Sequence, residues 1–224
     1  MGAGELEEMA TPGQMVRVVA DVLGVQAVTV SQYDRQLAEA GFRSKGGRGP
    51  SAIKVTAADV ANILIAILGS PVSGASIRAA AQVCEEIGSK RRTKAGSNLD
   101  VFADFGLRSL ASLPNAHTFR EAIAALIEGA SRGEFVRLAN LEHKSDHKSD
   151  LRYLDVTVRR PHPIAFIRVI GDDAGRQRRG FLEYFSNNGE RDTKNVHSID
   201  LSQERTVSNF TFEVLGKLIA NAET

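Results

Sequence analysis

The stretch VADVLGVQAVTVSQYDRQLAEAG, residues 19–41, places one glycine between two segments with helical apolar spacing. Glycine adopts the left-handed conformation that ends many helices at no steric cost, so Gly24 predicts a stop rather than one continuous helix. We expect the first helix to run to about Leu23 and the second from about Val28 to Ala40. The chain is therefore predicted to turn a tight corner at Gly24.

Two capping patterns predict where helices begin. TPGQ at 11–14 fits a capping box, with Thr11 as the N-cap, Pro12 at the first helical position and Gln14 reaching back to the cap. A second pattern, TAAD at 56–59, precedes the apolar segment ANILIAILG. That segment is apolar around most of its circumference, so we expect a buried helix that completes a core or forms a dimer seam.

The spacing across the corner at Gly24 is typical of a helix-turn-helix. A small residue lets the second helix approach closely, a glycine follows four residues later, and a β-branched residue anchors the second helix about six residues beyond. Ala20, Gly24 and Val30 fill these positions, with Leu23 and Val25 beside the turn. The pattern resembles the helix-turn-helix of bacterial and phage regulators. A purely structural helical hairpin is the alternative interpretation.

A basic, glycine-rich stretch, FRSKGGRGPSAIKVT at 42–56, follows the second helix directly. Its pattern predicts two short strands joined by a loop, which is the layout of a wing. Gly46 and Gly47 allow close approach to a phosphate, while Lys45 and Arg48 supply positive charge. A nucleotide-binding P-loop is disfavoured, because the G-x-x-x-x-G-K-[ST] spacing is missing and the stretch follows a helix.

Residues 11–69 together resemble the winged helix-turn-helix superfamily, and they look most like the small regulators of prophage-type and gene-transfer-agent clusters in alphaproteobacteria. The resemblance implies that the second helix enters the major groove of double-stranded DNA and that the wing contacts the backbone or the minor groove. The residues that we expect to contact DNA are Thr29, Ser31, Gln32, Arg35, Gln36, Arg43, Lys45, Gly46, Gly47, Arg48, Lys54, Lys90, Arg91 and Arg92.

Acidic residues near this helix leave a second interpretation open. Arg35 can form a surface ion pair with Asp21, Asp34 or Glu39 instead of pairing with guanine. Asp34 lies on the same helix, where a carboxylate would repel phosphate or accept a hydrogen bond from cytosine. Asp34 is the residue of this helix that argues against DNA recognition.

The whole chain predicts an α+β fold with three parts. We expect a winged helix-turn-helix domain over 11–72, a helical segment over 73–142 with a basic linker at 88–98, and a C-terminal domain over 150–224. Alternating stretches in the last part predict a small antiparallel sheet, followed by a terminal helix. Basic and acidic residues balance there, which suits dimerisation or regulation better than DNA contact.

Composition limits the class of protein. The net charge is +1, and 42% hydrophobic with 25% charged residues is ordinary for a globular chain. The one cysteine, Cys84, excludes an internal disulfide and fits a reducing compartment. The acidic first ten residues do not have the pattern of a signal peptide, and the longest apolar run, at 61–69, is too short to span a bilayer. We therefore expect a cytoplasmic protein with no membrane association.

Motifs of enzyme chemistry are missing from the sequence. There is no nucleophile elbow, no H-E-x-x-H, no C-x-x-C and no Rossmann fingerprint, so no catalytic site is predicted. The duplication HKSDHKSD at 143–150 is interpreted as a solvated loop rather than a metal site, and His117 as a capping or surface residue. No cofactor and no metal are expected.

These observations predict a sequence-specific regulator of transcription that binds double-stranded DNA. A homodimer is expected, because one helix-turn-helix contacts too few base pairs to specify a single site in a genome. A regulator of transcription also implies RNA polymerase as a further partner. One alternative is a phage-type DNA-packaging or recombination accessory protein, similar to a small terminase, that assembles as a ring or filament. Another is a protein–protein adaptor in which the helix-turn-helix is a scaffold.

Overall fold

The computed structural model describes residues 10–44, 54–70, 79–94, 96–135, 149–160, 163–173, 176–185 and 203–223. The helices of these segments are α1 (Pro12–Leu23), α2 (Ala27–Glu39), α3 (Ala57–Gly69), α4 (Ala80–Gly88), α5 (Asp100–Asp104), α6 (Arg108–Ala111), α7 (Phe119–Ser131) and α9 (Asn209–Glu223). The strands are β1 (Arg91–Arg92), β2 (Ser149–Arg160), β3 (Ile164–Asp173), β4 (Arg176–Phe185) and β5 (Gln203–Ser208). The expected α+β class is confirmed.

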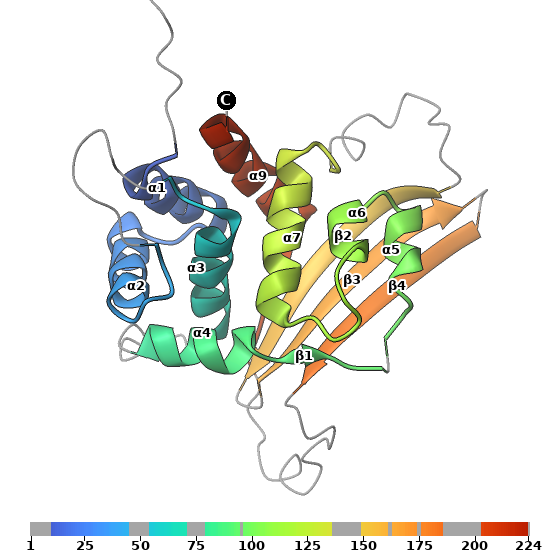
Figure 1. Cartoon of the computed structure of the whole chain (residues 1–224), viewed down its shortest axis with the longest axis horizontal. Coiled ribbons are helices and arrows are strands. Elements are labelled where there is room, and N and C mark those ends of the chain that lie inside the picture. The colour runs from blue at the N-terminus through green and yellow to red at the C-terminus, as the bar shows by residue number, and fades with distance from the viewer. Residues whose placement is uncertain are drawn as a thin grey trace, which may run out of the picture.

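The strands form one antiparallel sheet in the order β1-β4-β3-β2-β5. Side chains on its inner face alternate with those on its outer face, as a half-covered sheet requires. Along β2, Leu154, Val156 and Val158 are buried beneath the helices. Figure 1 shows α7 crossing in front of the sheet, with α5 and α6 beside it and α1, α2 and α3 grouped at the other end.

Helix α3 is the centre of the helical end of the molecule. Thr56 and Asp59 form its capping box, as the sequence predicted, and nearly every residue from Ala57 to Gly69 is buried. The helix packs against α2, α4 and α7 and also reaches β2. Residues of all three predicted parts belong to one hydrophobic cluster, so the helix completes a core that joins them.

The prediction of a basic linker at 88–98 is wrong. Arg91 and Arg92 form the edge strand β1, which pairs with β4. Beyond β1, the Ser97 N–H donates to the carbonyl oxygen of Phe181 on β4. Because these backbone groups extend the sheet, Arg91, Arg92 and Ser97 are held against β4 and do not belong to a tether between two independent units.

Two other elements differ from the sequence prediction. The helical segment expected over 73–142 is interrupted between α5 and α6, because Gly106 adopts a left-handed φ of 83° there. The strand β5 (203–208) was not predicted, because Val207 is its one buried hydrophobic side chain and an alternating pattern is lacking.

The described segments contain neither a membrane-spanning helix nor a cluster of metal-binding side chains. None of their helices has both the length and the apolar character that crossing a membrane requires. Their His, Cys, Asp and Glu side chains do not gather in threes as a metal centre would need. Most of the duplicated stretch at 143–150 lies outside these segments.

Candidate nucleic-acid interface

The corner between α1 and α2 has the geometry that the sequence predicted. Thr11 and Gln14 form the capping box of α1, and Gly24 ends the helix in the left-handed region with φ 63° and ψ 31°. A Cβ at Gly24 would meet no atom within 4 Å, so there is room for a larger residue. The left-handed backbone conformation is therefore what favours glycine at this position. Ala20 and Val30 are buried on the two sides of the corner.

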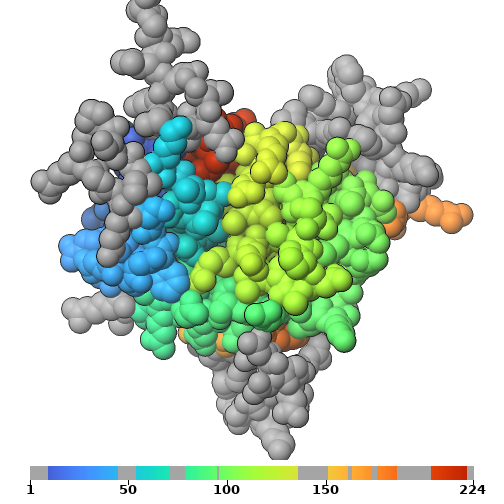
Figure 2. Space-filling model, in the orientation of Figure 1, coloured from blue at the N-terminus to red at the C-terminus, as the bar shows by residue number. Residues whose placement is uncertain are grey.

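Helix α2 has one face in the core and one face in solvent. Val30, Tyr33 and Leu37 are buried, as expected from their spacing. On the opposite side Ser31, Gln32 and Arg35 are exposed, and these three residues were predicted to read bases. The two remaining predicted residues on this helix, Thr29 and Gln36, are half-buried. Figure 2 shows α2 in blue at the margin of the molecule.

Arg35 forms an ion pair with Glu39 one helical turn later, with Arg35 Nε 3.1 Å from Glu39 Oε1. The side chains are 77% and 59% exposed, so solvent screens the pair and it contributes little to stability. This was the alternative interpretation of Arg35 in the sequence. Breaking such a pair has a small free-energy cost, so the guanidinium remains available to another partner.

Asp34 faces the protein rather than solvent. Its Oδ1 lies 2.7 Å from Nε of Arg43, although the N–H is not aligned on the oxygen as in a hydrogen bond. Burial raises the pKa of the Asp34 carboxyl, while the charge of Arg43 acts in the opposite direction. The carboxylate is therefore not presented on the exposed face of α2, which removes the sequence argument against DNA contact. Arg43, which was predicted to contact DNA, is largely buried and directs its charge to Asp34.

The chain leaves α2 along a path fixed by polar side chains of α3. Asn62 Nδ2 donates to the carbonyl oxygen of Phe42 at 2.6 Å, and the Ser44 N–H donates to Asp59 Oδ1 at 2.8 Å. The guanidinium of Arg120, on α7, lies 5.0 Å from the centre of the Phe42 ring. These contacts fix where the basic segment begins relative to α2.

Sequence reasoning did not identify this positioning cluster. Asn62 was the available signal, because it is a polar residue in an otherwise apolar helix and buried amides need partners. Arg120 gave no comparable signal, since its contact to Phe42 links residues far apart in the sequence.

The predicted wing is described only at its two ends. Lys45, Gly46, Gly47 and Arg48 lie outside the described residues. At the flanks, 42–44 and 54–56 are not strands, and the Val55 N–H donates to the carbonyl oxygen of Ala10. Lys54 is exposed beside this contact. The hairpin form of the wing stays a prediction.

The second basic group, at 90–92, is used to build the fold. Arg92 donates to Asn115 Oδ1 at 2.9 Å and to the carbonyl oxygen of Ser97 at 2.8 Å, so its charge holds two loops together. Arg91 is exposed, and Lys90 is half-buried. Figure 1 shows α4 between α2 and β1, so this group does not adjoin the exposed face of α2. The guanidinium of Arg92, which was predicted to contact DNA, is engaged by these two loops.

No family model, curated protein or solved structure matches this chain. The function of the chain is therefore inferred from the geometry of its own residues.

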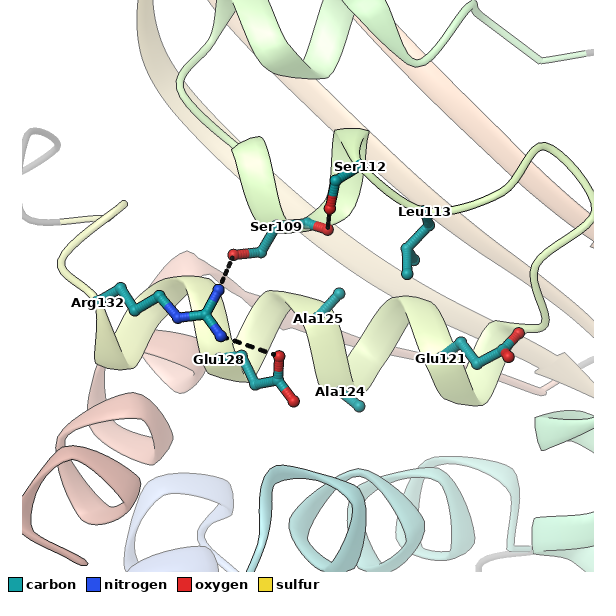
Figure 3. Close-up of a pocket in the computed structure, with 8 residues that line it drawn as sticks. All are labelled: Ser109, Ser112, Leu113, Glu121, Ala124, Ala125, Glu128 and Arg132. Atoms are coloured by element: carbon teal, nitrogen blue, oxygen red, sulfur yellow. Dashed lines mark hydrogen bonds and ion pairs between the residues drawn. The ribbon is translucent and has the colours of Figure 1, made fainter. Parts of the chain in front are cut away.

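A shallow pocket of about 270 Å³ lies between α6 and α7. Figure 3 shows Arg132, just beyond the C-terminal end of α7, reaching towards Ser109, with Glu128 beside it. Arg132 donates to Ser109 Oγ and pairs with Glu128, while Ser109 also donates to the carboxylate of Glu134. These polar groups pair with one another, so the Ser109 hydroxyl has both a donor and an acceptor beside it.

His117 is buried, which corrects its interpretation as a capping or surface residue. Its Nε2 lies 2.8 Å from the Tyr184 hydroxyl and its Nδ1 lies 2.7 Å from the carbonyl oxygen of Pro114. Burial lowers the pKa of His117 and raises that of Tyr184 well above its ordinary value. Both groups are neutral and enclosed, so the contact holds the helical layer against the sheet.

Proposed function

We propose that this protein is a transcriptional regulator that binds double-stranded DNA in a sequence-specific manner and places α2 in the major groove. The observation that carries the proposal is the exposed stripe of Ser31, Gln32 and Arg35 on a helix whose opposite face is buried. Arginine pairs with guanine and glutamine with adenine through two hydrogen bonds each, and serine accepts or donates to either.

The fixed orientation of α2 supports this function as much as the types of its exposed residues do. A recognition helix must present its side chains at a fixed angle, because base edges are read by directional hydrogen bonds. The left-handed Gly24 fixes the start of α2, and the Asp34–Arg43 pair with the bonds to Phe42 and Ser44 fix its end. The basic segment that follows supplies the charge for phosphate contact.

Selection of bound duplexes from a random DNA pool tests the proposal. We expect enrichment of one motif, and a palindrome would give the half-site spacing of a homodimer. The affinity for the enriched duplex should fall linearly with the logarithm of salt concentration. An unenriched pool together with an affinity that does not respond to salt would overturn the proposal in favour of an adaptor.

Two arginine variants separate base reading from phosphate contact. Arg35→Ala should weaken the enriched duplex by about 1–3 kcal/mol and relax its sequence preference, whereas Arg48→Ala should weaken all duplexes alike. Arg132→Ala is the matched control, because Arg132 forms the same kind of exposed pair with Glu128 on a different helix. If Arg35→Ala lost the same affinity for every duplex, the placement of α2 in the major groove would be wrong. A solution mass of a ring or filament would favour the DNA-packaging alternative.

A further inference from the structure

Val28 is an exposed hydrophobic side chain in the first turn of α2. Val28 is 61% exposed, and among the described residues Tyr153 and Phe210 are the other large hydrophobic residues that are exposed. A β-branched residue on the solvent side of a helix adds no packing and has only modest helix propensity. Stability of the fold therefore does not explain why this position is apolar.

Val28 continues the stripe that the proposed function assigns to the groove. Val28, Ser31, Gln32 and Arg35 have the spacing i, i+3, i+4 and i+7, which places them along one face of a helix. Val28 is at the N-terminal end of this face, and the N-terminal residues of a recognition helix contact base edges. Its isopropyl group would therefore be among the groups that contact base edges.

The major groove offers one apolar group to such a side chain. Of the four bases, thymine alone carries a methyl group, at C5, while the other edges present hydrogen-bond donors and acceptors. A single valine beside exposed Ser31 and Gln32 is too small to form a protein-docking surface, because interfaces are centred on a buried apolar cluster.

We propose that Val28 selects thymine at one position of the DNA target by packing its isopropyl group against the thymine 5-methyl group. This inference rests on the proposed function, since it needs α2 in the major groove. It adds a sequence requirement that hydrogen-bonding residues of the helix do not impose. An A·T pair is then expected at a fixed place in each half-site.

Deoxyuridine tests the inference directly, because it keeps every hydrogen-bonding group of thymidine and removes only the methyl group. The probe is the duplex enriched from the random pool, synthesised with deoxyuridine in place of each thymidine in turn. At one position the wild-type protein should bind about fourfold more weakly, which is the worth of one buried methyl group. At that position Val28→Ser should bind the two duplexes equally, while Val28→Thr keeps a methyl and part of the difference.

Phe210→Ser is the matched control, since Phe210 is equally exposed but lies on α9. It should retain the full difference between thymine and uracil. Equal binding of wild-type protein to all substituted duplexes, or an enriched half-site without an A·T pair, would overturn the inference and leave the proposed function standing. A pool that shows neither enrichment nor salt-dependent binding would overturn the proposed function itself.

Discussion

Arg43 Nε lies 2.7 Å from Asp34 Oδ1, and the two side chains are only 19% and 13% exposed. The pair connects the inner face of α2 to the chain just beyond its end. Because the carboxylate and the guanidinium face each other inside the protein, neither belongs to the outer surface of the helix. The pair sets the orientation of α2, while Ser31, Gln32 and Arg35 lie exposed on the opposite side of the helix.

Removing the carboxylate of this pair should destabilise the protein. Asp34→Ala leaves the Arg43 guanidinium largely buried without its partner, and we expect a loss of about 2 kcal/mol in the free energy of unfolding. Urea denaturation measures it. Arg35→Ala on the same helix is the control, because its pair with Glu39 is exposed and its loss should change stability by less than about 0.5 kcal/mol. Similar losses in the two variants would contradict a structural role for Asp34.

Replacing Gly24 at the corner between α1 and α2 should also destabilise the protein. Gly24→Ala forces an L side chain into a left-handed conformation, so we expect a loss of about 1–2 kcal/mol in the free energy of unfolding. Gly13→Ala is the control, because Gly13 is inside α1 and an added Cβ would come no closer than 4.0 Å to Thr11. That control should be neutral or slightly stabilising. Thermal unfolding of the two variants would disprove the prediction if their midpoints shifted alike.

The elements that could be predicted from the sequence are those with a local signal. The capping boxes at Thr11 and Thr56 and the glycine at 24 act within one turn of chain, and the structure contains all three. The long strands of the C-terminal part have several alternating apolar residues. These signals gave the α+β class and the exposed face of α2.

The elements that were missed depend on partners far along the chain. β1 consists of Arg91 and Arg92, which have no apolar pattern and become a strand because β4 offers a free edge. The role of Arg43 depends on Asp34, and a basic residue in a basic stretch gives no local sign of burial. Charge clusters in a sequence therefore do not by themselves identify an exposed basic surface, because arginine also serves as a structural donor.

Glu39 is expected to oppose DNA binding under the proposed function. Its carboxylate holds Arg35 at 3.1 Å and adds negative charge beside the stripe. Glu39→Gln removes both effects, so the affinity for the enriched duplex should rise about twofold to fivefold. Fluorescence anisotropy at fixed salt measures it. Glu128→Gln is the control on the equivalent pair of α7 and should leave the affinity unchanged. Weaker binding by Glu39→Gln would show that Arg35 needs this partner when bound.

The buried imidazole of His117 predicts how stability depends on pH. Burial lowers its pKa below the ordinary value of 6.5, so the unfolded chain takes up a proton at a higher pH than the folded chain does. Stability from the neutral imidazole is therefore complete above pH 6.5 and declines as the pH falls below it towards the folded pKa. The free energy of unfolding of wild-type protein should be lower at pH 5.5 than at pH 7.5.

His117→Gln isolates this effect, because glutamine keeps a polar side chain but does not titrate. The variant is less stable at neutral pH if the bonds to Tyr184 and Pro114 matter, yet its stability should change less between pH 7.5 and 5.5 than that of the wild type. Glu121 also has a lowered pKa, through the Thr118 backbone N–H, but its window begins below 4.5 and lies outside this range. The two proteins differ only at residue 117, so all other titrating groups contribute equally to both. If the urea midpoints of both proteins fell equally between pH 7.5 and 5.5, His117 would not be the group responsible.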